Sequence, residues 1–223
     1  MKRYVIASSR DWFLNEEKSP AFLEYDFTYI NNKEDLNKEN LDRISPRYIF
    51  FPHWNWKVSS DIFDTFECVA FHTAPLPYGR GGSPIQNLIM QDFEESPVNA
   101  LKMSKNLDSG PIYESMDISL SGSLSDIFPR IAKKIELMII NIINNEPMPI
   151  DQIGEPAFFK RRKPSDSKIP ENYSIDQLYN HIRMLDGPDY PKAFIDLGSK
   201  GIEFSQVEKI GDELRAVVTI KSK

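Results

Sequence analysis

The chain has 223 residues, of which 40% are hydrophobic and 12% aromatic, enough for a sizeable core in one domain with or without a small appendage. A formal net charge of −6 disfavours a nucleic-acid binder that relies on diffuse positive charge. The single cysteine, Cys68, excludes an internal disulfide framework and a cysteine-based metal cluster. Because Cys68 lies in an apolar run, we expect a core residue rather than a nucleophile.

The N-terminal stretch does not resemble a signal peptide, since Ser8, Ser9, Arg10 and Asp11 interrupt its apolar run. No other run approaches the length of a membrane span. We therefore expect a cytoplasmic protein that does not associate with membranes.

Short apolar runs alternate with polar stretches through the first half of the chain. Strands are predicted at 4–7, 27–30, 48–51 and around 69–71, with a helix-compatible stretch at 35–43. This βαβ pattern indicates an α/β protein with an open, mostly parallel twisted sheet and helices on both faces. No GxGxxG motif follows the first strand, so a dinucleotide-binding fingerprint is absent.

Further along, Ala100–Leu120 is predicted as β structure around a turn. A long helix is predicted at 126–145, where a stripe of apolar side chains recurs at near-helical spacing from Ile127 to Ile143. Ser123 and Asp126 form a capping-box start, and Pro147 prevents continuation. After residue 150 the pattern changes to a helix at 174–185 and strands at 193–195, 201–204 and 215–220. We expect a main domain over 1–150 and a small C-terminal helix-and-strand appendage over 151–223.

The segment Cys68–Met90 combines a buried strand, a loop rich in Pro and Gly, and a helix that starts at Pro84. His72 lies at the exit of the strand. Such a loop beside a helix N-terminus suits an anion or an oxyanion, with one titratable imidazole at its mouth. A single His after a strand is also compatible with a structural role, and a Gly/Pro-rich loop with an ordinary turn.

Two motifs in this chain resemble those of a known enzyme family. The run His72-Thr-Ala-Pro-Leu-Pro77-Tyr-Gly-Arg80-Gly81, followed by Ser83-Pro-Ile-Gln86, resembles the signature loop of formyltransferases that use N10-formyltetrahydrofolate. Asn106-Leu-Asp108-Ser-Gly-Pro-Ile112 resembles the family's Asp-(Thr/Ala)-Gly segment, and its separation from His72 agrees with the family's. The resemblance implies a Rossmann-like formyltransferase fold with its catalytic domain over 1–150 and a substrate-side appendage over 151–223.

The resemblance also implies roles for individual residues. His72 takes the proton of an attacking amine, and Asp108 orients and stabilises the imidazole. Asn106 and Asp108 are candidates for contacts with the folate donor, and no metal is implied. Without the resemblance, Asp108 would be an ordinary turn residue in Asp-Ser-Gly-Pro.

One position departs from the family pattern. The family carries a catalytic Asn two residues before the His, where this chain has Ala70. An Ala side chain donates no hydrogen bond to a developing oxyanion, and His53 is the candidate to replace that donor. His53 and Trp54 follow a predicted strand and are candidates for the folate slot, whereas Trp54 and Trp56 are equally interpretable as core residues.

Substrate contacts are expected from two segments. In the signature loop, the candidate substrate-binding residues are Arg80, Gly81, Gly82 and Gln86. The basic run Lys160–Lys163 is either a solvated surface loop or a phosphate contact, in which Arg161 and Arg162 hold the diphosphate of a nucleotide-linked sugar.

Several segments look most like the short sugar N-formyltransferases of bacterial surface-polysaccharide (pseudaminic-acid-type) pathways: 51–54, 159–164, 182–186 and 190–194. That subgroup implies formyl transfer to the amino group of a nucleotide-linked amino-deoxy sugar. It implies no nucleic-acid or membrane partner, and it is compatible with a homodimer. Two alternatives are a formyltransferase acting on methionyl-tRNA or a purine precursor, and a non-catalytic folate- or nucleotide-binding relative, suggested by Ala70. The negative net charge, and the lack of room for a larger C-terminal tRNA-binding domain, disfavour methionyl-tRNA as the acceptor.

Overall fold

The computed structural model describes residues 2–222. They form two compact units. The first comprises the residues up to Gly81, Pro97–Ile118 and Phe128–Phe158, and the second comprises Gly82–Ser96, Ser119–Ile127 and the residues from Phe159 onward. The assignment of 1–150 as a catalytic domain and 151–223 as a substrate-side appendage stays a prediction.

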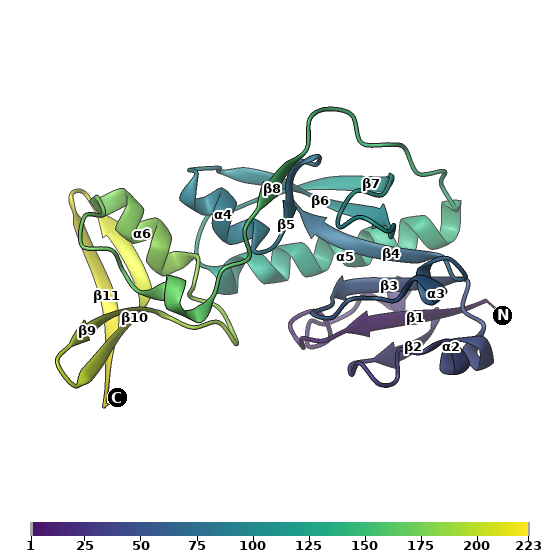
Figure 1. Ribbon diagram of the computed structural model, residues 1–223, viewed down its shortest axis with the longest axis horizontal. Coiled ribbons are helices and arrows are strands. Elements are labelled where there is room, and N and C mark those ends of the chain that lie inside the picture. Colours follow the sequence, from purple (N-terminus) through teal and green to yellow (C-terminus); the bar gives the residue numbers. More distant parts are fainter. Residues whose placement is uncertain (1, 223) are drawn as a thin grey trace. The chain divides into compact units, whose positions relative to one another are not determined.

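A six-stranded sheet in the order β2-β1-β3-β4-β6-β7 lies mainly within the first unit (Figure 1). Its strands are β1 (Arg3–Ser8), β2 (Asp26–Ile30), β3 (Tyr48–His53), β4 (Cys68–Thr73), β6 (Glu95–Lys102) and β7 (Ile112–Ser119). The β2, β1, β3 and β4 strands pair in parallel, whereas β4 and β6 pair antiparallel. The predicted open, mostly parallel sheet is confirmed.

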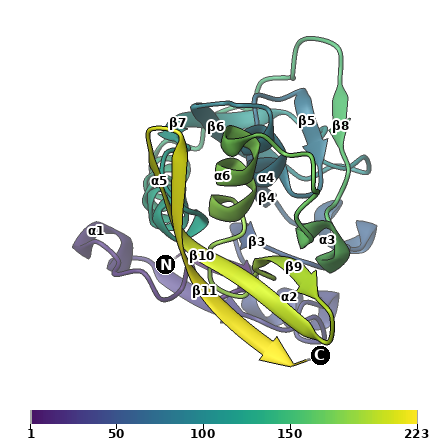
Figure 2. The same ribbon diagram turned by 90° about the vertical axis from the view of Figure 1, so that its left-hand side faces the viewer.

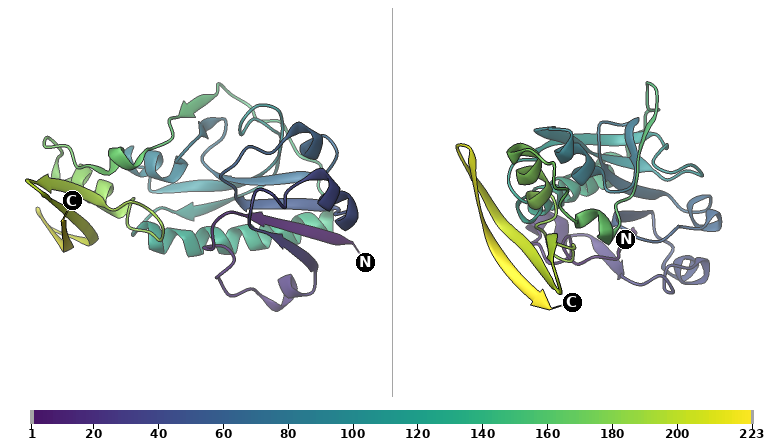
Figure 3. Two further views of the ribbon diagram at one scale, coloured as in Figure 1. Left: turned by 60° about the horizontal axis from the view of Figure 1, so that its bottom comes forward. Right: turned by 60° about the vertical axis from the view of Figure 1, so that its left-hand side comes forward.

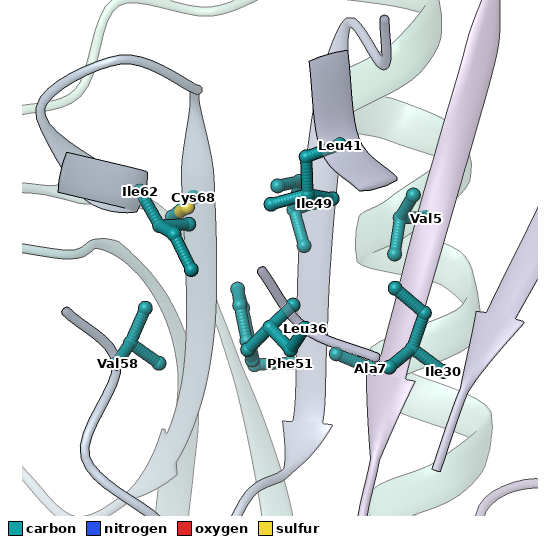
Figure 4. Close-up of a cluster of buried hydrophobic side chains, with 10 residues drawn as sticks. All are labelled: Val5, Ala7, Ile30, Leu36, Leu41, Ile49, Phe51, Val58, Ile62 and Cys68. Carbon is teal, nitrogen blue, oxygen red and sulfur yellow. The ribbon is translucent and has the colours of Figure 1, made fainter. Parts of the chain in front are cut away.

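The sheet is covered on both faces. On one face, Leu41 of α2 (Lys38–Ile44) and Ile62 of α3 (Ser60–Phe63) join a buried cluster with Val5, Ile49 and Cys68 (Figure 4). Tyr4 and Ile6, which alternate with Val5 along β1, are buried as well. Cys68 is therefore a core residue, as predicted, and burial raises the pKa of its thiol to about 12.

The long helix α5 (Leu124–Asn145) begins two residues earlier than predicted. The backbone N–H and the hydroxyl of Ser123 both donate to the Asp126 carboxylate, at 2.8 and 2.7 Å. The predicted apolar stripe is buried, and Asn141 donates to Glu114 of β7 at 2.8 Å. The helix runs along the strands in Figure 3.

The second unit contains α4 (Pro84–Met90), α6 (Ile175–Arg183) and an antiparallel sheet in the order β11-β10-β9 (Figure 2). The strands are β9 (Ala193–Leu197), β10 (Lys200–Ile210) and β11 (Glu213–Ser222). Ser174 caps α6 in a capping box with Gln177, which confirms the predicted start of this helix. The predicted helix-and-strand appendage is present, with longer strands than expected.

Several short elements were not predicted: α1 (Pro20–Leu23), α3, β5 (Tyr78–Gly81), β8 (Ala157–Phe159) and the 3-10 helix η1 (Pro164–Ser167). The β5 sequence, Tyr-Gly-Arg-Gly, is typical of a loop. Its strand form comes from pairing with β8, a segment far away in sequence, and the N–H of Ala157 donates to the Pro77 carbonyl at 3.2 Å. Among the described helices, none is both long and apolar enough to cross a membrane.

Candidate active site

His72 is placed by the end of the buried strand β4. Its side chain is 8% exposed, and in the β4–β6 register it lies opposite Asn99. The Asn99 amide donates to the carbonyls of Ala74, at 2.6 Å, and His72, at 3.3 Å, while the hydroxyl of Ser115 donates to the Asn99 side-chain oxygen at 2.6 Å. Buried, satisfied polar groups therefore fix the main chain that carries the imidazole.

Both ring nitrogens of His72 face acceptors. Nε2 lies 2.8 Å from the carbonyl oxygen of Gly79, and Nδ1 lies 3.5 Å from Oδ2 of Asp108. A neutral imidazole has one N–H, so only the protonated ring can donate to both. The second distance exceeds an ordinary hydrogen bond but is within ion-pair range. This geometry suits an imidazole that gains a proton during a reaction.

Asp108 lies in a tight turn between β6 and β7, as the sequence predicts. Its φ is +51°, and its Oδ2 accepts a hydrogen bond from the backbone N–H of Gly81 at 2.9 Å. The turn passes so close to β6 that a Cβ on Gly110 would lie 1.7 Å from the carbonyl oxygen of Lys102. The structure thus brings three sequence-predicted site residues together: His72, Asp108 and Gly81.

Arg80 and Asn106 border this pair. The Nε and Nη2 groups of Arg80 donate to Oε1 of Gln152 at 3.1 and 2.7 Å. The backbone carbonyl of Asn106 accepts hydrogen bonds from the hydroxyls of Ser104, at 3.1 Å, and Ser109, at 2.9 Å. The signature loop is therefore bonded to Gln152, whereas the turn around Asp108 is bonded internally.

His53 lies at the end of the neighbouring strand. Phe51 pairs with Ala70 in the β3–β4 register, so His53 and His72 each follow a paired residue by two positions. The His53 ring lies 3.2 Å from the side-chain oxygen of Asn55 through Nε2. Because the carboxyl ends of parallel strands share one edge of a sheet, this register supports the inclusion of His53 in the candidate site.

Trp54 packs on the hydrophobic core, with its ring centroid 6.0 Å from that of Phe51 and 5.0 Å from that of Trp56. The core interpretation of Trp54 is confirmed. Its indole Nε1 is buried without a hydrogen-bond partner in the described part of the chain. A contact between Trp54 and a folate stays a prediction.

The remaining predicted substrate residues belong to the second unit. A Cβ on Gly82 would lie 2.5 Å from Cβ of Arg161, and the N–H of Arg162 donates to the Ser83 hydroxyl at 3.1 Å. Burial lowers the pKa of Arg162, and Gln86 is 3% exposed. The structure thus joins the loop at Gly82 to the basic run, whereas the near-complete burial of Gln86 favours a packing role for that side chain.

Sequence reasoning missed Asn99 and Gln152. The only local sign of Asn99 is a polar side chain within the apolar run of β6, and Gln152 lies in a loop of ordinary composition. No three His, Cys, Asp or Glu side chains among residues 2–222 are grouped so that they could hold a metal ion.

Comparisons with known proteins agree with this fold. Residues 164–221 match the model of the methionyl-tRNA formyltransferase C-terminal domain. A solved methionyl-tRNA formyltransferase from Clostridium thermocellum is 36% identical, with a TM-score of 0.94 and full coverage of both chains. The methionyl-tRNA formyltransferase of a Campylobacter jejuni strain is 25% identical over 94% of this chain and 71% of its own.

A sugar N-formyltransferase from Shewanella has a TM-score of 0.67 at 12% identity, covering 97% of this chain and 96% of its own, which shows a shared fold alone. The sheet topology is that of an α/β formyltransferase fold, as the match to the Clostridium thermocellum protein shows. On the whole-length match at 36% identity, the chain belongs to the formyltransferase family, whose members use formyl-tetrahydrofolate.

Proposed function

We propose that this enzyme transfers a formyl group from N10-formyltetrahydrofolate to the amino group of a nucleotide-linked amino-deoxy sugar, giving an N-formyl sugar for a surface polysaccharide. The observation that carries the reaction is the His72 ring, held between the Asp108 carboxylate and the Gly79 carbonyl. The sugar acceptor is supported by the sequence segments that resemble sugar N-formyltransferases. The fold shared with the Shewanella enzyme is compatible with it.

Proton transfer in this mechanism runs through His72. The donor, when bound, supplies an electrophilic formyl carbon and leaves as tetrahydrofolate. Because Nδ1 faces Asp108, Nε2 is the atom that takes the proton of the attacking amine and returns it to the departing nitrogen. The Gly79 carbonyl oxygen lies 2.8 Å from Nε2, so the substrate amine must either share Nε2 with this carbonyl or displace it. Asp108 stabilises the imidazolium between the two transfers.

The oxyanion needs a donor that Ala70 does not supply, and we propose His53 for this role. Replacing His53 with Ala should lower kcat on the order of 100-fold with little change in melting temperature, since loss of one oxyanion donor typically costs that much. His53→Asn, which keeps an N–H donor, should recover part of the rate. Unchanged turnover in His53→Ala would exclude the assignment.

Arg161 and Arg162 are proposed to hold the diphosphate of the acceptor. Changing each to Gln should raise the acceptor KM more than it lowers kcat, because this contact exists before and during the reaction. Arg162 also donates to the Asp166 carbonyl within its own segment. Melting temperature must therefore be measured alongside, and a loss of stability equal to the loss of binding would show a structural role.

Methionyl-tRNA is the second candidate acceptor, because the matched domain model and the curated relatives carry that name. The two are separated by an acceptor screen that includes UDP-, dTDP-, GDP- and CMP-linked amino sugars and initiator methionyl-tRNA. Products are identified by mass spectrometry, and tetrahydrofolate release is followed by absorbance. Formylation of one amino sugar, and none of methionyl-tRNA, supports the proposal, and the reverse pattern overturns it. Donor binding without any product supports a non-catalytic relative.

We also propose a cytoplasmic enzyme that forms a homodimer. The edge strand β11 exposes Val217, Val218 and Ile220, apolar side chains that a second copy would cover. Light scattering after size exclusion measures this directly, and a monomer at micromolar concentration would contradict it.

A further inference from the structure

Gln152 connects the two loops that meet at the candidate active site. It lies beyond the end of α5, far in sequence from both loops, and its side chain is partly buried. Its Oε1 accepts two hydrogen bonds from the Arg80 guanidinium, at 3.1 and 2.7 Å. Its Nε2 donates to the carbonyls of Asp108 and Gly110, both at 2.9 Å. Both the oxygen and the NH₂ group of the Gln152 carboxamide are thus hydrogen-bonded.

The chemistry of the partners fixes the orientation of this amide. A guanidinium only donates and a backbone carbonyl only accepts, so a flipped amide would set N–H groups against Arg80 and an oxygen against two carbonyls. Gln is matched to this position, because Glu has no donor for the carbonyls and Lys has no acceptor for the guanidinium.

The contacts of Gln152 close a ring around Asp108. The Asp108 carboxylate accepts from the N–H of Gly81, Arg80 precedes Gly81 and donates to Gln152, and Gln152 donates back to the Asp108 carbonyl. Asp108 is therefore held at its side chain and at its main chain by one closed set of bonds. This matters because the Asp108 backbone has φ +51°, a conformation that non-glycine residues seldom adopt without support.

We propose that Gln152 is a positioning residue that sets the Asp108 carboxylate against the His72 imidazole, with Arg80 as its anchor rather than as a substrate ligand. Gln152 acts through Asp108 and does not itself touch the reacting atoms. Its effect on turnover rests on the proposed function, whereas its effect on the His72–Asp108 contact does not.

The test uses Gln152→Glu, which keeps an oxygen for Arg80 but replaces the donor with an oxygen facing two carbonyls. The chain has three histidines, so 15N-labelled imidazole signals can be assigned with a His72→Gln variant. We expect the His72 ring signals of Gln152→Glu to move toward those of Asp108→Asn. We also expect kcat to fall on the order of 10- to 100-fold, because displacing a reacting group by about 1 Å can cost that much, with donor KM changed less than about threefold.

Gln177→Glu is the matched control, because Glu serves a capping box as well as Gln does and should leave both readouts unchanged. Should Gln152→Glu not fold, Gln152→Met, of similar length and without polar atoms, answers the same question. A folded variant whose His72 signals match the wild type overturns the proposal. If wild-type protein formylates no acceptor, the proposed function fails, but the ring signals still decide the role of Gln152.

Discussion

Gly110 shows how closely the Asp108 turn is packed on the sheet. A Cβ at this position would lie 1.7 Å from the Lys102 carbonyl oxygen. The carbonyl belongs to the backbone and the Cβ is attached directly to the backbone, so no side-chain rotation can relieve the clash. Gly110→Ala must therefore displace the turn. We expect a loss of on the order of 2 kcal/mol in the free energy of unfolding, together with reduced formyl transfer.

Urea unfolding measures this effect, and Gly201→Ala is the matched control. A Cβ on Gly201, in β10, has nothing within 4 Å. Equal stability of the two variants would show that the turn at Gly110 can shift without cost.

For single residues, the sequence predicted the His72–Asp108 pair but not the residues that hold this pair in place. His72 and Asp108 were found because each lies in a local motif. The roles of Asn99 and Gln152 depend on antiparallel pairing with β4 and on a loop beyond α5, and neither relation leaves a periodic or compositional signal. Arg80 was assigned to substrate from its motif, whereas in the structure its guanidinium is bonded to Gln152.

Helix α6 contains a buried titratable group, His181. The side chain is 1% exposed, Nε2 lies 3.2 Å from the Ser167 carbonyl, and burial lowers its pKa. Unfolded His binds a proton near pH 6.5, so below that pH the unfolded chain holds more protons than the folded one. Its contribution to stability is therefore complete above about pH 6.5 and is lost as the pH falls toward the folded pKa.

We expect the free energy of unfolding to fall between pH 7.5 and 5.5 by less in His181→Gln than in the wild type. Urea unfolding of both proteins at the two pH values measures the difference. The same fall in both proteins would mean that His181 does not contribute to the acid sensitivity.

Among the elements, those with an internal pattern were predicted well. The start of α6 at Ser174 and the apolar stripe of α5 follow from caps and periodicity. The β5 and β8 strands were not predicted, because four residues rich in Gly become a strand only when a distant segment pairs with them. The signature loop is thus more ordered than its composition suggests.

For the whole molecule, the sequence predicted a mostly parallel sheet, and the structure adds the reversal at β6. Strand direction is set by the connection from β4 through β5 and α4, which alternation of apolar residues does not encode. Because β6 runs antiparallel to β4, Asn99 lies opposite His72, and the chain enters the turn that carries Asp108 after β6 ends.

The central claim is that the His72–Asp108 pair performs formyl transfer, and single-turnover kinetics test it most directly. Wild type, His72→Asn and Asp108→Asn are each mixed with N10-formyltetrahydrofolate and the acceptor found by the screen, and formylated product is followed by mass spectrometry. We predict that each variant binds the donor, retains its fold and transfers formyl on the order of 10² to 10⁴ times more slowly, as expected for loss of general-base catalysis. Transfer at the wild-type rate by either folded variant would contradict the account.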